Sequence, residues 1–309
     1  MSKLVTIFGG SGFVGRYITW RMAREGWRVR VAVRRPNEAI FVRPYGVVGQ
    51  VEPVFANIRD DASVDQVLHG ADAVVNCVGT FDAFGKNNFD AIQAEGATRI
   101  ARLAANRGID RMVHISAIGA DANSHSRYGR SKASGEAGVL QHQPGAILLR
   151  PSVVFGPEDA FFNRFAGMTR ISPALPVVGG RTRFQPVYVD DVALAAQRYL
   201  ERAATGGVYE LGGPDVETFS QLMKRMLRVI RRRRLIVDIP LWAASIIGRV
   251  SDLVWRVTGG LIPAQITADQ VRSLRNDNVV ADGAAPLQAL GITPTARAPV
   301  LPHYPWHSR

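Results

Sequence analysis

Short apolar runs alternate with longer, helix-like segments along the first half of the chain. The runs that we predict as buried strands cover residues 4–8, 27–33, 51–56, 73–78, 111–115 and 146–149. Helical stretches lie between them, from Phe13 to near Gly26, up to Gly70, and over residues 89–107. Strands separated by helices require right-handed crossovers, which build a parallel sheet. The pattern therefore predicts an α/β fold, a doubly wound parallel sheet with helices on both faces.

Beyond Arg150 this alternation weakens, and prolines and glycines such as Pro173, Pro176 and Gly179 become frequent. We expect one further strand–helix unit, residues 186–199, to return to the main sheet. This predicts a larger domain of residues 1–156, joined by residues 184–203. A smaller, discontinuous C-terminal lobe would then hold residues 157–183 and 204–309.

Three glycines, Gly9, Gly12 and Gly15, directly follow the first predicted strand in the sequence GGSGFVG. A glycine turn after an N-terminal strand, with a helix opening at Phe13 and Val14, is typical of a Rossmann-type dinucleotide site. The first glycine permits the turn, the second lets the phosphates approach the backbone, and the third lets helix and strand pack closely. The diphosphate would lie on the amide groups at the positive end of the helix. The spacing differs from G-x-G-x-x-G, and a glycine turn with no ligand is the alternative.

Arg34 and Arg35 stand at the end of the second predicted strand. An acidic residue there binds the ribose hydroxyl groups of NAD, whereas an arginine pairs with the 2′-phosphate of NADP. The next carboxylate in the sequence is Glu38. We therefore expect the cofactor to be NADPH; a solvated basic turn is the alternative.

Tyr128 and Lys132 are four residues apart in the sequence YGRSK, which places them on one face of a helix. A nearby ammonium group stabilises a phenolate, so this tyrosine could act as a general acid or base near neutral pH. Ser116 ends the fifth predicted strand, where its hydroxyl group could orient a carbonyl group. Such a tyrosine–lysine pair alone is common by chance, and its position after the glycine turn is what favours a site.

These motifs together resemble the extended short-chain dehydrogenase/reductase superfamily. The residues that carry the resemblance are GGSGFVG, Gly79, Ser116, YGRSK, LLRPSVVFGP and PVYVDDVA, over residues 4–200. The resemblance implies that Tyr128 and Lys132 reach the nicotinamide ribose and that Ser116 and Tyr128 flank a substrate carbonyl group. It further implies that Pro151 and Val153 border the nicotinamide, and that Val78 and Gly79 line the cofactor.

The loop between Ser116 and Tyr128 is short, and the run HISAIGADANSHSRYGRSKASGEAGV resembles the atypical branch of the superfamily. That run, with residues 262–271 and 275–280, is similar to the nucleotide-binding accessory subunit of respiratory complex I in its bacterial form. The resemblance implies an NADPH that is structural or redox-sensing, with no independent turnover expected. It implies subunits of the complex I peripheral arm as partners, at the cytoplasmic face of the inner membrane. A free NADP-dependent reductase or epimerase, or a redox-sensing regulator, is the alternative.

The net charge of +12 favours an anionic partner. Residues 221–234, QLMKRMLRVIRRRR, predict an amphipathic helix with its cations at the C-terminal end, followed by residues rich in Trp, Leu and Ile up to Trp255. This pattern fits anionic lipid headgroups, and a solvated face beside a core helix is the alternative. Nucleic acid is not expected, since no RNA- or DNA-binding motif is found.

The remaining sequence features set limits on the class of protein. The single cysteine, Cys77, excludes an internal disulfide and favours a reducing compartment. We find no secretory signal, and the apolar stretches are shorter than the roughly 20 residues that span a bilayer. The proline-rich tail, residues 298–306, is expected to lie on a partner or to be unstructured. His303 and His307 stand apart from any Cys or carboxylate cluster, so we expect no metal.

Overall fold

A computed structural model describes residues 2–257, 267–298, 300 and 304 of the chain. Its largest element is an eight-stranded sheet in the order β14-β11-β6-β5-β4-β1-β2-β3, with every neighbouring pair parallel. The strands are β1 (Leu4–Phe8), β2 (Arg28–Val33), β3 (Val51–Phe55), β4 (Ala73–Asn76), β5 (Met112–Ile115), β6 (Ile147–Pro151), β11 (Gly207–Leu211) and β14 (Ala285–Pro286). The predicted α/β fold with a doubly wound parallel sheet is confirmed.

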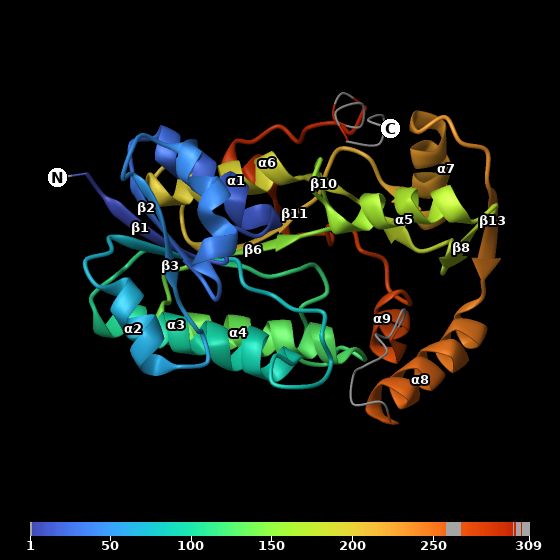
Figure 1. The fold of residues 1–309 in the computed structure, drawn as a ribbon, viewed down its shortest axis with the longest axis horizontal. Helices are drawn as coiled ribbons and strands as arrows, with labels where there is room; N and C mark the ends of the chain where they lie inside the picture. Colours follow the sequence, from blue (N-terminus) through green and yellow to red (C-terminus); the bar gives the residue numbers. More distant parts are fainter. Residues whose placement is uncertain (1, 258–266, 299, 301–303, 305–309) are drawn as a thin grey trace.

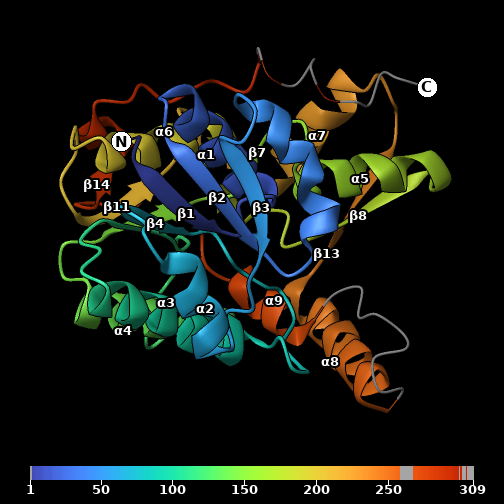
Figure 2. The same ribbon diagram turned by 60° about the vertical axis from the view of Figure 1, so that its left-hand side comes forward.

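Helices cover both faces of this sheet, as Figures 1 and 2 show. One face carries α1 (Phe13–Arg24) and α6 (Val189–Leu200). The other carries α2 (Asp61–Leu68), α3 (Glu95–Asn106) and α4 (Arg127–His142), with a π-helix, Asp90–Ala94, leading into α3. Two short 3-10 helices, Pro36–Tyr45 and Leu287–Leu290, flank the sheet.

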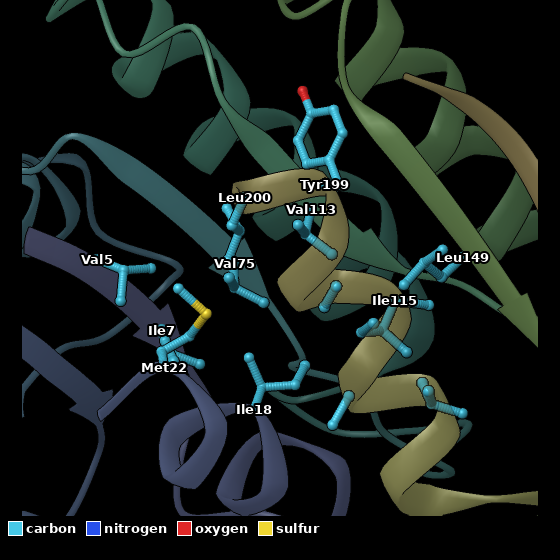
Figure 3. Packing of buried hydrophobic residues seen from close by; sticks show 14 of the residues in the cluster. Val5, Ile7, Ile18, Met22, Val75, Val113, Ile115, Leu149, Tyr199 and Leu200 are labelled. Carbon is cyan, nitrogen blue, oxygen red and sulfur yellow. The ribbon is translucent and has the colours of Figure 1, made fainter. Parts of the chain in front are cut away.

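The core lies between the sheet and these helices because alternate residues of each strand point to opposite faces. Val5 and Ile7 of β1 pack with Ile18 and Met22 of α1 (Figure 3), whereas Phe8 packs on the opposite face. All of these side chains are fully buried. Burial on both faces explains why the strands read as continuous apolar runs.

The second lobe is built from short elements on one side of the large sheet (Figure 1). Its helices are α5 (Ala160–Ile171), α7 (Phe219–Val229), α8 (Leu241–Val257) and α9 (Ala268–Ser273). Its strands pair two by two: β7 (Val154–Phe155) with β10 (Val187–Tyr188), β8 (Ala174–Val178) with β13 (Leu235–Ile239), and β9 (Arg183–Phe184) with β12 (Glu217–Thr218). Aromatic residues dominate its core, which includes Phe155, Phe162, Phe184 and Phe219.

Two segments lie in places that the sequence did not predict. The strand in residues 186–199, β10, pairs with β7 instead of joining the main sheet, and only the following helix, α6, returns to cover that sheet. The position beside β6 is occupied by β11, which with β14 extends the main sheet. Parts of residues 204–309, which the sequence placed in the smaller lobe, therefore belong to the large sheet.

The helices α8 and α9 pack closely on each other beneath β13 (Figure 1). They meet at Gly248, where a Cβ atom would lie 2.8 Å from the backbone nitrogen of Ala268. The sequence predicted a motif over residues 262–271, of which 262–266 lie outside the described residues, as do His303 and His307.

Candidate dinucleotide-binding site

The carboxyl ends of five parallel strands bring most of the predicted site residues to one edge of the sheet. Following the strand order, this edge carries Pro151 of β6, Ser116 after β5, Gly79 after β4, Gly9 after β1 and Arg34 after β2. The chain order of the strands reverses around β1, and open α/β sheets bind their ligands at such a point. The structure therefore brings these residues together along one line.

The glycine turn after β1 has the geometry that the motif predicts. Gly9 has a φ of +75°, which favours glycine, and its carbonyl oxygen accepts from the Gly12 amide at 2.9 Å. At Gly15 a Cβ atom would lie 2.2 Å from that same carbonyl oxygen, so any larger residue would push α1 away from the turn. The first turn of α1 has neither a side-chain cap nor an acidic residue, which leaves its amide groups available to an anion.

A cation beside this turn, Arg16, was missed by the sequence analysis. Its guanidinium group donates to the carbonyl oxygens of Gly12 and Ser11, at 3.4 and 3.3 Å, and lies over the ring of Phe41 at 4.9 Å. In the sequence, this role of Arg16 is indicated by its position directly after Gly15. Arg16 adds positive charge next to the amide groups of α1.

The two arginines after β2 differ in their surroundings. Arg35 forms an exposed ion pair with Glu38 at 3.1 Å. Within the described part of the chain, no carboxylate lies within ion-pair distance of Arg34, which is also exposed. Arg34 is thus the arginine whose guanidinium group is available to a ligand.

Lys132 projects from α4 toward the strand ends. Its Nζ atom donates to the carbonyl oxygen of Ile115 at 3.1 Å, and a Cβ atom on Gly79 would lie 3.8 Å from it. Burial lowers the pKa of Lys132 to about 8, although the nearby Glu136 and Cys77 act in the opposite direction. Lys132 is therefore placed between β4 and β5, where the resemblance puts the nicotinamide ribose.

Tyr128 lies one turn before Lys132, and aromatic rings enclose it. Phe81 stacks on the Tyr128 ring at 5.5 Å between centroids, and Phe89 meets it edge-on at 5.8 Å. Burial raises the pKa of Tyr128 to about 12. The prediction of a stabilised phenolate is therefore wrong, because desolvation outweighs any effect of the ammonium group of Lys132.

Ser116 is 4% exposed, and its Oγ atom has no hydrogen-bond partner among the described residues. Its backbone is fixed, since the Ser116 amide donates to the Leu149 carbonyl oxygen at 2.7 Å and that of Ile118 donates to Pro151 at 3.1 Å. An orphaned, buried hydroxyl group at a strand end is available to a ligand atom.

The other predicted residues line the same edge. Val78 lies against the glycine turn: a Cβ atom on Gly9 would lie 3.3 Å from its Cγ2. Val153 follows β6, half-buried, and its amide donates to the side-chain oxygen of Asn278 at 3.1 Å. Helix-end amide groups, a free arginine and an orphaned serine on one edge are the groups that an extended dinucleotide requires.

Comparison with known proteins assigns the family. The model of the NAD dependent epimerase/dehydratase family matches residues 5–212, more than half of the chain. The chain belongs to this family. The predicted resemblance to extended short-chain dehydrogenases/reductases is thereby confirmed.

Two related proteins match this chain over almost its whole length. The Arabidopsis thaliana protein named NADH dehydrogenase (ubiquinone) 1 alpha subcomplex subunit 9, mitochondrial, is 34% identical over 298 residues, 94% of this chain and 74% of that protein. The Neurospora crassa NADH-ubiquinone oxidoreductase 40 kDa subunit, mitochondrial, is 30% identical over 302 residues, 97% of this chain and 78% of that protein. The predicted similarity to a subunit of respiratory complex I is confirmed by these relatives.

A solved structure of low sequence identity shares the fold. The Bordetella bronchiseptica enzyme WbmH, in complex with NAD+, aligns with a TM-score of 0.69 over 98% of this chain and 97% of its own, at 16% identity. The family is thus named for its dependence on NAD, and this structural neighbour was solved with NAD+ bound.

The basic segment lies in the second lobe, beyond the residues that the family model matches. Helix α7 ends at Val229, and Arg231 has a φ of 53°, so residues 231–234 form a turn that we call the basic turn. The sequence prediction of one helix to residue 234 is wrong here. The apolar face of α7, with Leu222 and Met226, is buried in the core of the lobe and therefore does not contact a membrane.

The basic turn and α7 line a concave surface that encloses a volume of about 1030 Å³. The cations on it are Lys224, Arg228, Arg231, Arg232, Arg233 and Arg234. In the described residues no carboxylate lies within ion-pair distance of them, whereas Arg225 next to them pairs with Glu217. Exposed Leu235 also lines this surface.

Helix α8 exposes an apolar face, which we call the α8 face. It consists of Trp242, Ile246 and Val250, spaced four residues apart, with Ile247 beside them. Trp242 is 70% exposed and the other three are about half-exposed. Figure 2 shows α8 projecting from the lobe. Exposed apolar groups at helical spacing indicate a surface that contacts another molecule.

The described residues hold no group of three or more His, Cys, Asp or Glu side chains arranged to bind a metal ion. Within the same part of the chain, every helix is too short or too polar to span a bilayer.

Proposed function

We propose that this protein is a nucleotide-binding accessory subunit of a respiratory NADH:quinone oxidoreductase, complex I, and contacts subunits of its peripheral arm. The observation that carries the proposal is the match of the whole chain, second lobe included, to two proteins named as subunits of that enzyme. The similarity to these two relatives is not confined to residues 5–212, which the family model matches, since it extends over the second lobe as well.

The cofactor that we propose is NADPH, held along the carboxyl edge of the sheet. The diphosphate would lie on the amide groups of Phe13 and Val14 with Arg16 beside it, and Arg34 would pair with the 2′-phosphate. Ser116, Tyr128 and Lys132 would hold the nicotinamide ribose. NADPH would supply a dihydronicotinamide ring that can donate a hydride.

A structural or redox-sensing role fits the state of Tyr128 better than rapid turnover. A tyrosine with its pKa raised to about 12 transfers its proton poorly at neutral pH. A retained nucleotide also stabilises the fold by mass action, by roughly 4 kcal/mol at a thousand times its Kd.

Docking at the cytoplasmic face of the inner membrane would use the second lobe. The α8 face supplies Trp and Ile side chains, and the basic turn supplies cations that attract anionic lipid headgroups, each contributing about 1 kcal/mol. These two surfaces lie on the same lobe, which supports a peripheral position between the enzyme and the bilayer.

The test is a gentle-detergent pull-down of the tagged protein from the membranes of its host, with the nucleotide in the eluate assayed. We expect a quinone-reducing assembly and a stoichiometric amount of non-covalent NADPH. The double variant Trp242→Ser/Ile246→Ser should lose the assembly but keep the nucleotide. Val47→Ser/Val48→Ser, two exposed residues of the other lobe, is the matched control.

Recovery of a lone protein that exchanges its nucleotide freely would contradict the proposal. The cofactor choice is tested separately with Arg34→Asp/Arg35→Asp, which should weaken binding of NADPH and leave that of NADH unchanged. Equal affinity of this variant and the wild type for NADPH would exclude the proposed contact with the 2′-phosphate.

A second candidate function is a free NADP-dependent reductase or epimerase. The orphaned Oγ atom of Ser116 favours it, since that atom could bind a substrate carbonyl oxygen. NADPH oxidation with a panel of carbonyl compounds, abolished in Tyr128→Phe, would establish this function.

A further inference from the structure

The start of helix α4 is held from the second lobe. The first amide groups of a helix have no partner within it and need acceptors from elsewhere. Asp269 of α9 supplies them: its Oδ1 accepts from the Arg127 amide at 2.7 Å and its Oδ2 from the Tyr128 amide at 3.0 Å. The N-cap Ser126 accepts from the Gly129 amide at 2.9 Å. One carboxylate thus fixes the turn that carries Tyr128.

This contact is specific in both charge and shape. Asp269 is 6% exposed, so its two oxygens are committed to the helix, with Arg272 of its own helix at 3.8 Å. A negative charge at the N-terminus of a helix is also favoured by the helix dipole. Both carboxylate oxygens of Asp269 accept a hydrogen bond. Neither the side-chain amide of an asparagine nor the displaced carboxylate of a glutamate would therefore satisfy both backbone amide groups.

A second contact of this kind holds the opposite wall of the site. The Oδ1 atom of Asn278 accepts from the Ser152 hydroxyl group at 2.6 Å and from the Val153 amide at 3.1 Å. The carbonyl oxygen of Asn278 also accepts from the Ser152 hydroxyl group, at 2.9 Å. The backbone amide of Asn278 donates to the carbonyl oxygen of Arg183 at 2.8 Å, and the guanidinium group of Arg183 pairs with Asp277 at 2.7 Å. The segment after β6 is thereby tied to residues 277–278.

The two contacts hold only the part of the proposed site that would bind the nicotinamide half of the cofactor. Gly9, Gly12 and Arg34, which would hold the adenosine half, come from the N-terminal strands and loops. The walls of the nicotinamide half, Tyr128 and Val153, are each tied to a residue beyond position 260. A change in the second lobe should therefore affect one end of the nucleotide and not the other.

We propose that Asp269 and Asn278 are positioning residues that set the nicotinamide end of the cofactor site. They touch no cofactor atom themselves and act through Tyr128 and Val153. This inference rests on the proposed NADPH site, and it gives the C-terminal motif that the sequence analysis singled out a role in cofactor binding. The alternative is that both residues join the two lobes with no effect on the ligand.

The experiment compares the Kd of two ligands, NADPH and 2′-phospho-ADP (adenosine 2′-phosphate 5′-diphosphate), which lacks the nicotinamide and its ribose. Asp269→Asn and Asn278→Ala should each weaken NADPH binding by about tenfold, the value of one lost hydrogen bond to a charged or buried group. Affinity for 2′-phospho-ADP should stay within about twofold of the wild type. Asp269→Glu, which keeps the charge and moves the carboxylate, should fall between Asp269→Asn and the wild type and provides a milder variant if Asp269→Asn folds poorly.

The matched control is Asp159→Asn. Asp159 is also a buried carboxylate that accepts from two backbone amide groups in the second lobe, those of Phe162 and Gly156. It should lower the thermal midpoint without changing the ratio of the two affinities. Equal weakening of both ligands in Asp269→Asn, or no change in either, would overturn the inference. A wild type that binds neither ligand would instead refute the proposed NADPH site, and the inference with it.

Discussion

The hydroxyl group of Tyr304 donates to the carboxylate of Asp159 and accepts from the Gly156 amide at 2.8 Å. Tyr304 and Asp159 are 145 positions apart, and each is 2% exposed. Val300 is buried in the same core. The sequence analysis expected the tail to lie on a partner or to be unstructured, but these two residues pack into the lobe of their own chain.

Replacing Tyr304 with Phe removes the donor from a buried carboxylate. Burial raises the pKa of Asp159, and the hydrogen bond from Tyr304 opposes that rise. Tyr304→Phe should therefore reduce the free energy of unfolding by about 1–3 kcal/mol. Urea denaturation at neutral pH measures this loss. A variant as stable as the wild type would mean that the tail contributes nothing to the fold.

Replacing each of three helical glycines with alanine should change the stability of the protein in opposite directions. At Gly15 a Cβ atom would meet the Gly9 carbonyl oxygen at 2.2 Å, and at Gly135 it would meet that of Gln93 at 2.1 Å. Both alanine variants should be destabilised, and Gly15→Ala should also lose nucleotide binding. Gly167 has open space around it, so Gly167→Ala should gain about 0.5–1 kcal/mol from helix propensity. Thermal unfolding of the three variants checks the order; a destabilised Gly167→Ala would contradict it.

The pKa of Lys132 makes stability depend on pH in the alkaline range. Its folded-state pKa of about 8 lies below the ordinary 10.5, so the unfolded chain binds more protons between these values. The contribution of Lys132 to stability should therefore rise with pH through this window. In the nucleotide-free protein, the unfolding free energy of the wild type should increase relative to that of Lys132→Met by about 2–3 kcal/mol from pH 7 to pH 10. A difference that stays constant would show that Lys132 is not desolvated.

A row of buried and half-buried charges extends from Lys132 across the sheet. Arg150 of β6 forms two hydrogen bonds with Glu136, at 2.9 and 2.6 Å, and approaches Glu210 at 3.6 Å. Glu136→Gln leaves the guanidinium group of Arg150 undercompensated and should cost about 3 kcal/mol. It should also lower the pKa of Lys132 further, because Glu136 opposes the effect of burial there.

The control for this variant is Glu52→Gln. Its ion pair with Arg43, at 2.6 Å, is about half-exposed on both sides, and its loss should change stability by less than about 1 kcal/mol. Equal effects of the two substitutions, measured by urea denaturation, would contradict the distinction between buried and exposed pairs.

The elements fixed by local patterns were the ones that the sequence predicted well. The run Leu4–Phe8, the turn at Gly9 and the helix opening at Phe13 follow from apolar continuity and glycine conformation, which act within a few residues. The predicted alignment of Ser116, Gly79 and Gly9 follows from parallel topology. These features needed no knowledge of distant contacts.

The features that the sequence did not predict depend on distant partners. The raised pKa of Tyr128 comes from burial among aromatic residues, including Phe81 of a distant loop. The pairing of β11 with β6 and the contact of Asp269 with α4 join residues far apart in the sequence. Nothing in the local pattern distinguishes Asp269 from any other acidic residue in a short helix.

Helix α8 packs against α9 at Gly248 and against the loop after β4. Its exposed side is the α8 face. Its inner side contacts α9, which carries Asp269, and its Trp255 stacks on Phe84 of the loop after β4 with the ring centroids 5.0 Å apart. A partner that docked on α8 and displaced it would therefore alter the affinity for the nucleotide. Thermodynamic reciprocity then requires the nucleotide to alter the affinity for the partner by the same factor. Assembly and nucleotide binding would in this way be coupled equilibria, readable as a difference in docking affinity between the nucleotide-free and the nucleotide-bound protein.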